Sequence, residues 1–406
     1  MDAPRSSACT LGMEYRLVAA PLPPCAVLID RHVVKNAGTT LQSITFENDL
    51  RDGWAYWGYG LNNLRRVAYE LQRAINRSSR CEDWEHRPPL RILGSLHYGS
   101  RHGIRDMFDS FGPASPLRQV MLQCTCKVVL MTRVREPTAW YRSFWSWSGV
   151  KRRQVRNSSV HGSTMIEFAQ TYSNLQSLLL LWHTNIVVTA QYVGARVNTR
   201  ANLRRYRCFE PPGYRYTPKT AEDRVLQRCG PGLSKRVDTL RQALRTFDLV
   251  GLVERFDETL LLLADMLGLQ HILRSAARNL SPRGAYGNAS LLGCAEDCHA
   301  QIAAAAPVDA LMYSEMNASF AARVEAQGDA FATRVRMLRE ARAATPIPKL
   351  RGIRMSAKQD EKRMGVMSPK QCRGLLAGEE GSSAERVCRL VTADNQFSFA
   401  WRTERG

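Results

Sequence analysis

The sequence predicts an α/β fold in which a central parallel sheet is flanked by helices. Three short, mostly apolar runs have the length and composition of buried strands: Cys25–Asp30, Leu90–Leu96 and Lys127–Thr132. A fourth run, Phe247–Val253, leads directly into an apolar helix pattern at Phe256–Leu267. Strands that alternate with helices favour a parallel sheet, because a parallel crossover needs a connection long enough to hold a helix.

The helices between these strands are predicted from local signals. Leu41 and Ile44 continue at helical spacing after the first strand, and Pro137 suits the first turn of a helix after the third. Leu175–His183 has the composition of a buried helix, and Pro307–Arg342 that of one or two helices rich in Ala, Arg and Glu. We expect residues 196–232, rich in Arg, Pro, Gly and Tyr, to be an irregular basic excursion.

The amino-acid composition limits which class of protein this can be and which partners it can bind. The 406 residues include 57 Lys and Arg against 37 Asp and Glu, a formal net charge of +20, and 44% are hydrophobic. This composition excludes a mostly disordered chain. The positive charge predicts an anionic partner, which could be nucleic acid, a membrane surface, an acidic polysaccharide or nucleotide phosphates. We expect a flexible N-terminal segment at 1–24, a folded domain at 25–345 and a basic C-terminal tail at 346–406.

Signals for the cellular compartment point in two directions. No apolar run approaches the roughly 18 residues that span a bilayer, and the N-terminus lacks the apolar centre of a signal peptide. The 11 cysteines have no zinc-site spacing, so we expect free buried thiols or scattered disulfides and no metal. Glycosylation sequons favour the secretory pathway, and they begin at Asn76, Asn157, Asn279, Asn288 and Asn317. The alternatives are a cytosolic protein, or one whose targeting segment is not in this sequence.

A turn of small residues joins the first strand to its helix and could cradle a phosphate. Small residues let the backbone approach an anion, and the helix N-terminus offers unpaired N–H groups. Gly-Lys occurs nowhere in the chain, so this is not a Walker A loop, and the alternative interpretation is an ordinary strand–helix turn. The candidate residues are Lys35, Asn36, Ala37, Gly38, Thr39 and Thr40.

A second candidate anion site follows the third strand. Arg135 stands at the end of that strand, and Ser143 lies eight residues later, about two turns into the next helix. A guanidinium can grip a phosphate through two parallel hydrogen bonds, and a hydroxyl can donate another. The alternative is an arginine in a surface ion pair and a serine on a helix face.

Together, the two segments resemble the carbohydrate sulfotransferases of the Golgi that use 3′-phosphoadenosine 5′-phosphosulfate (PAPS), such as the heparan sulfate and galactose-3-O enzymes. His32–Leu41 is similar to the family segment that holds the 5′-phosphosulfate, although Asn36 stands where the family has Thr or Ser. Arg135–Ser143 is similar to the segment that holds the 3′-phosphate. The resemblance implies a P-loop-like three-layer fold, with 25–345 as the sulfotransferase domain.

The resemblance also implies roles for individual residues. Lys35 would neutralise the charge that develops on the leaving 5′-phosphate, and PAPS would be the donor with no metal required. His97, in a segment resembling the one that bears the family's base, would be the catalytic base, with His102 and then Glu254 as the alternatives. Arg283 would lie in a loop that closes over the nucleotide.

The implied activity is transfer of a sulfuryl group to a hydroxyl of a glycan or glycolipid, most readily an anionic one, in the Golgi lumen or membrane. Association with a membrane would require a segment beyond this sequence. Two alternatives stay open. One is a sulfotransferase-fold protein that binds without turnover. The other is a nucleic-acid-binding protein, which would explain the charge but has no recognisable nucleic-acid-binding motif, so we expect no nucleic-acid partner.

Overall fold

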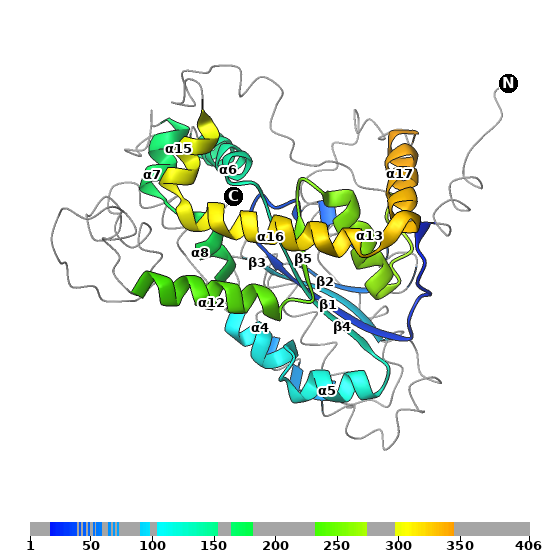
Figure 1. The fold of residues 1–406 in the computed structure, drawn as a ribbon. Coiled ribbons are helices and arrows are strands. Elements are labelled where there is room, and N and C mark those ends of the chain that lie inside the picture. Colours follow the sequence, from blue (N-terminus) through cyan, green and yellow to red (C-terminus); the bar gives the residue numbers. More distant parts are fainter. Residues whose placement is uncertain are drawn as a thin grey trace.

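The computed structural model describes residues 17–38, 54–58, 90–97, 104–152, 164–181, 232–273 and 297–344, with isolated residues between 40 and 72 (Figure 1). Thr39, His102, Arg283 and the tail at 346–406 lie outside these residues, so the expectations for them stay predictions. No helix in the described part of the chain is long and apolar enough to span a bilayer.

A parallel sheet forms the centre of the molecule and confirms the predicted α/β class. Its five strands lie in the order β2-β3-β1-β4-β5, and every neighbouring pair is parallel. Their bounds are β1 Cys25–His32, β2 Ala55–Gly58, β3 Leu90–His97, β4 Lys127–Val134 and β5 Leu249–Leu252.

Helices lie on both sides of this sheet. Figure 1 shows α4 and α5 below the strands and α13 and α17 above them. The helices with full bounds are α4 Ile104–Phe111, α5 Pro116–Gln123, α6 Pro137–Arg152, α7 Met165–Thr171, α8 Leu175–Leu181, α12 Gly232–Thr246, α13 Phe256–Leu267, α15 Cys298–Ala305, α16 Pro307–Glu325 and α17 Gly328–Ala344. The helix after β1 is described at Gly38, Thr40, Leu41, Ile44, Thr45 and Asn48.

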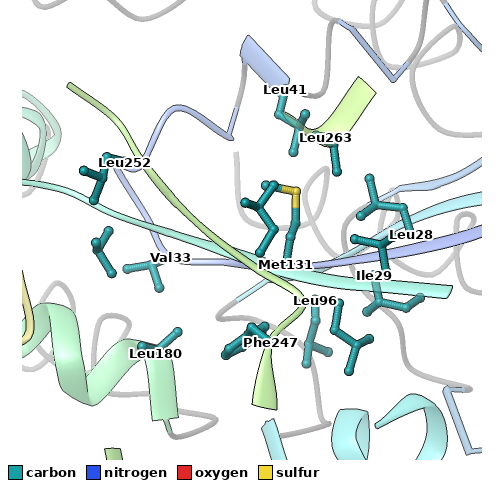
Figure 2. Packing of buried hydrophobic residues seen from close by; sticks show 14 of the residues in the cluster. Leu28, Ile29, Val33, Leu41, Leu96, Met131, Leu180, Phe247, Leu252 and Leu263 are labelled. Atoms are coloured by element: carbon teal, nitrogen blue, oxygen red, sulfur yellow. The ribbon is translucent and has the colours of Figure 1, made fainter. Parts of the chain in front are cut away.

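Apolar side chains cover both faces of the sheet, as a parallel sheet requires. All eight residues of β1 are buried, which fits its central position between β3 and β4. Figure 2 shows Leu41 and Leu263 on one side of the strands and Leu180 and Phe247 on the other. The core therefore has two halves, and β1 separates them.

Part of the N-terminal segment, expected to be flexible over 1–24, is packed at residues 17–24, while residues 1–16 lie outside the described residues. Leu17 is fully buried, and its carbonyl accepts a hydrogen bond from Arg334 of α17 at 3.1 Å. The carbonyl of Pro23 accepts one from Arg91 of β3 at 2.6 Å. Residues 17–24 are therefore packed on the domain, because buried apolar side chains and paired backbone groups hold them there.

Disulfides are part of the fold. Cys25 and Cys126 face each other where β1 and β4 begin, and they are joined across 101 residues of sequence. Cys124 and Cys298 are disulfide-bonded as well. The expectation of scattered disulfides is confirmed for these four cysteines.

Candidate functional site

The order of the strands indicates one place, at the carboxyl ends of two central strands, where a ligand would bind. β1 and β4 are neighbours, but the chain leaves β1 toward β2 at one edge and leaves β4 toward β5 at the other. Ligands of open α/β sheets bind where adjacent strands send their connections apart in this way, outside the carboxyl ends of the strands. The predicted anion-binding segments that begin at Lys35 and Arg135 both follow these two strands.

The backbone of the turn after β1 has an unusual conformation. Lys35 and Ala37 have φ angles of 68° and 56°, in the left-handed region that residues with a Cβ rarely adopt. The N–H of Asn36 donates to the carbonyl of Val33 at 3.2 Å and closes the turn. Such a conformation persists only where the surroundings hold it, and it is typical of functional sites. Alternating backbone conformations of this kind also form concavities that accept anions.

Gly38 explains how the helix can start so close to the strand. A Cβ built on Gly38 would lie 1.5 Å from Cε1 of the buried His32 ring, so only glycine fits beneath that ring. The helix N-terminus consequently lies at the carboxyl end of β1, with its positive dipole end toward the same edge. Thr40 lies in the first turn of this helix.

The side chain of Asn36 points into the protein. It is fully buried, and its amide nitrogen donates to the carbonyl of Arg133 at 2.6 Å and to Oε1 of Gln176 at 3.0 Å. We predicted from the sequence that Asn36 contacts the sulfuryl donor, PAPS. The structure places its amide beneath the turn, where it supports the backbone around Lys35 and Ala37.

A buried charged cluster underlies the turn. Arg133 of β4 is 1% exposed and donates to Oδ2 of Asp30 at 2.8 Å and to the carbonyl of Asn36 at 2.8 Å. One of its nitrogens is also 3.2 Å from Nδ1 of His32. Burial, and then the charge of Arg133, holds the pKa of His32 well below its ordinary value, so the ring is neutral at physiological pH. The hydrogen bonds of this buried cluster hold the Lys35 turn in its conformation.

Arg135 and Lys35 meet at the carboxyl ends of β4 and β1. Nη1 of Arg135 donates to the carbonyl of Lys35 at 3.2 Å, although 100 residues separate them. Burial, and then the nearby guanidinium, lowers the pKa of Lys35 to about 8. The Arg135 side chain is 26% exposed, and Nε lies 3.9 Å from Oε1 of Glu254. Two cationic side chains therefore share one partly open site.

The alternative base, Glu254, is engaged at this edge. Its Oε1 accepts the N–H of Glu136 at 3.1 Å and faces Arg135. Burial raises the pKa of this carboxyl, and the charge of Arg135 opposes that shift. Glu254 acts in the structure as an ion-pair and loop-holding residue.

Helix α6 is bound directly to the turn. The indole N–H of Trp140 donates to the carbonyl of Val34 at 2.8 Å, and the Trp140 ring stacks on Phe144 with centroids 4.9 Å apart. Ser143 lies one turn beyond Trp140 on the same helix and is 9% exposed. Ser143 therefore lies on the helix that contacts the turn, with its side chain largely inside the protein.

His97 also lies at the carboxyl edge. It is the last residue of β3 and is paired with His32 in the register of β1 and β3. Its backbone is thus one strand away from the turn that carries Lys35, while its side chain lies outside the described part of the structure. Its role as base stays a prediction.

Two residues to which the sequence analysis gave no role in the site support it from inside the protein: Gln176 and Asp309. Gln176, at the start of α8, accepts the N–H of Arg135 at 2.8 Å and donates to its carbonyl at 3.0 Å. Asp309 of α16 accepts the N–H groups of Gln176 and Ser177 at 3.2 and 2.8 Å. No local pattern marks a glutamine for this role, because its partners are 41 and 140 residues away.

Fold and site together define an α/β protein in which a lysine and an arginine meet at the carboxyl edge of a parallel sheet. Among the described residues, no group of His, Cys, Asp and Glu side chains is arranged to hold a metal ion. A scan against protein-family models finds no match for the chain. Searches of curated proteins and of solved structures find no match either.

Proposed function

We propose that the protein is a PAPS-dependent sulfotransferase with a P-loop-like three-layer fold, which transfers a sulfuryl group to a hydroxyl of a glycan or glycolipid. One observation carries the proposal: Arg135 donates to the carbonyl of Lys35 at 3.2 Å at the switch point of the sheet. Two segments that separately resemble the two phosphate-binding segments of one family are therefore in contact. This contact supports one shared site for a donor that carries two phosphates.

The described residues fit such a donor. The turn at Lys35 combines left-handed backbone, a helix N-terminus and an ammonium group, and each of these favours an anion. Arg135 offers a partly exposed guanidinium beside them. PAPS would supply the sulfuryl group and a 5′-phosphate as leaving group.

The proposed reaction is an in-line displacement at sulfur. The acceptor hydroxyl oxygen forms a bond to sulfur while the bond from sulfur to the 5′-phosphate oxygen breaks, which releases 3′,5′-ADP. Lys35 stabilises the negative charge on that leaving oxygen, and His97 takes the proton of the hydroxyl. Arg135 and Ser143 hold the 3′-phosphate, and Arg283 and Thr39 are further candidates for donor contacts.

The disulfides support a secretory compartment for this activity. Disulfides persist in oxidising compartments and are rare in the cytosol, and at least four cysteines of this chain are bonded. The sequon at Asn317 lies on an exposed part of α16. We therefore place the enzyme in the Golgi lumen, where anionic glycans suit its net charge of +20.

The first experiment is transfer of labelled sulfate from PAPS to a panel of desulfated glycans and glycolipids. We expect label in the wild type and a loss of at least about a hundredfold in Lys35→Ala and His97→Ala, as is usual when a charge-stabilising group or base is removed. Lys127→Ala is the matched control, because Lys127 begins β4 at the opposite end of the sheet. It should keep full activity.

Binding to 3′,5′-ADP separates the remaining alternatives. A wild type that binds this nucleotide but labels no acceptor is a binder without turnover on that panel. A wild type that binds DNA and not 3′,5′-ADP is a nucleic-acid-binding protein, and the proposal is then wrong.

A further inference from the structure

One buried side chain joins the two candidate anion-binding segments. Oε1 of Gln176 accepts the backbone N–H of Arg135 at 2.8 Å and also Nδ2 of Asn36 at 3.0 Å. Its Nε2 donates to the carbonyl of Arg135 at 3.0 Å. The Gln176 amide thus pairs with both the N–H and the carbonyl of Arg135, as the backbone of a neighbouring strand would. Its Oε1 also binds Asn36 in the turn after β1.

Gln176 itself is held in place by both ends of α8. At its start, Asp309 accepts the N–H of Gln176 at 3.2 Å. At its end, the fully buried Arg31 of β1 donates to the carbonyls of Leu179 and Leu180 at 2.7 and 2.9 Å. A helix of seven residues anchored at both ends cannot shift along its axis without breaking these bonds.

This arrangement fixes the distance between the Lys35 turn and Arg135, which the pairing of the strands does not set by itself. β1 and β4 are paired only as far as Arg31 and Thr132, so the residues beyond them need other contacts to stay in place. Arg133 ties the turn to β4 through the carbonyl of Asn36. Gln176 ties the turn to the backbone of Arg135, beside the direct hydrogen bond from the Arg135 guanidinium to the carbonyl of Lys35.

We propose that Gln176 is a positioning residue that sets the spacing between the Lys35 turn and Arg135, and so selects ligands with two separated anionic groups over ligands with one. The inference rests on the proposed function, in which 3′,5′-ADP is the product. Gln176 is fully buried and acts through the two segments that it joins.

The test compares Gln176→Met with Gln270→Met. Methionine keeps the length of the side chain and removes its hydrogen bonds. Gln270 is a matched control, because it is 9% exposed and its amide donates to the carbonyls of Ala20 and Gly268, both at 3.1 Å. Calorimetry would give the affinity of each variant for 3′,5′-ADP and for 5′-AMP, and thermal melting would give its stability. If Gln176→Met does not fold, Gln176→Glu retains the accepting oxygen and loses the donor to Arg135.

We expect the preference for 3′,5′-ADP over 5′-AMP to fall about tenfold in Gln176→Met, the size expected for losing one or two net hydrogen bonds. Gln176→Glu should show a smaller fall. Gln270→Met should lose stability and keep the preference of the wild type. A ratio of affinities does not depend on the fraction of folded protein, so general destabilisation cannot produce this result.

A second readout needs no nucleotide. Competitive acetylation followed by peptide mass spectrometry reports the pKa of Lys35, which is about 8 in the intact site. When the turn separates from Arg135, we expect that pKa to rise above 8 in Gln176→Met and to stay near 8 in Gln270→Met; the rise stays short of 10.5, because burial is the larger cause of the shift and Arg135 the smaller. An unchanged Lys35 pKa together with an unchanged preference would overturn the inference. If the wild type binds neither nucleotide, the proposed function fails, while the acetylation result still decides whether Gln176 positions the turn.

Discussion

The ammonium group of Lys35 lies where two effects oppose its positive charge. Partial burial removes water that would stabilise the charge, and the guanidinium of Arg135 adds repulsion, so the pKa falls to about 8. A phosphate bound beside both groups would raise the pKa of Lys35 again, because its negative charge stabilises the protonated ammonium group. Binding of an anion above pH 8 must therefore be coupled to proton uptake by Lys35, whereas below pH 8 the group is already charged.

This coupling predicts a pH dependence for the nucleotide. The affinity for 3′,5′-ADP should be constant from pH 6.5 to 7.5 and should fall by up to about tenfold per pH unit above pH 8. Lys35→Arg keeps a charge at all these pH values, so its affinity should stay flat to pH 9.5. Calorimetry at five pH values measures both curves. A parallel decline in the wild type and Lys35→Arg would mean that another group controls binding.

Single residues also explain why the turn departs from the family pattern. A Thr or Ser at position 36 has a short hydroxyl, whereas the Asn36 amide reaches both the carbonyl of Arg133 and Oε1 of Gln176. A residue at which the turn departs from the resembling segment thus makes contacts that hold the turn in place. Sequence reasoning assigned Asn36 to the ligand because the motif position suggested it, and the direction of the side chain could not be read from the sequence.

At the level of elements, α8 and α16 cap each other. Oδ1 of Asn174 accepts the N–H groups of Val308 and Asp309 at 2.8 and 3.4 Å, at the start of α16. Asp309 in turn accepts the N–H of Ser177 at 2.8 Å and its hydroxyl at 2.5 Å. Each helix N-terminus therefore has two of its backbone N–H groups bound by a side chain at the start of the other helix. This exchange fixes α8, and with it the Gln176 side chain.

Replacing Asp309 should weaken this pair of helices. Asp309→Asn keeps the volume but turns an amide NH2 toward N–H donors, so we expect a loss of about 2 kcal/mol in the free energy of unfolding at pH 7. Asp329→Asn, on the exposed first turn of α17, should change it by less than about 0.5 kcal/mol. Urea denaturation of both variants measures the difference.

The same variant gives a pH signature. Burial raises the pKa of Asp309 from 3.8 to about 6. Because the folded protein then holds this proton more tightly than the unfolded chain, the contribution to stability is full below pH 4 and is lost as the pH rises through about 6. The wild type should therefore exceed Asp309→Asn by more at pH 5 than at pH 7. The opposite order would show that the ionised carboxylate is the stabilising form.

Elements with strong local signals could be predicted, and elements defined by distant contacts could not. Cys25–His32, Leu90–His97 and Lys127–Val134 are strands where apolar runs predicted them, and the helix Phe256–Leu267 has the predicted bounds. The edge strand β2, Ala55–Gly58, was missed because four residues carry too little periodicity. Helices α4, α5 and α12 were also missed, because their sequences mix charged, polar and apolar residues.

At the scale of the whole molecule, strand order decides what the candidate site can be. The sequence indicated two anion-binding segments, each with an ordinary structural alternative. The order β2-β3-β1-β4-β5 brings their strands together and sends their connections apart, which no local pattern could reveal. The contact between Arg135 and Lys35 is a consequence of that order.

The disulfide between Cys25 and Cys126 joins the same two strands at the opposite end from the site. A bond that closes a loop of 101 residues restricts the unfolded chain strongly. We expect Cys25→Ala/Cys126→Ala to lower the free energy of unfolding by about 2–5 kcal/mol in urea titrations. The denaturant slope should rise, because the unfolded chain becomes less compact.

The affinity for 3′,5′-ADP should stay within about twofold of the wild type, because six paired positions of β1 and β4 still hold the two strands in register. Stability and binding would then depend on opposite ends of the β1–β4 pair. The Cys25→Ala/Cys126→Ala variant would change stability, and Gln176→Met would change nucleotide binding. If nucleotide affinity instead falls in step with stability, the carboxyl edge is not held by Gln176 and its neighbours but by the strand pair as a whole, and the disulfide would be part of what shapes the site.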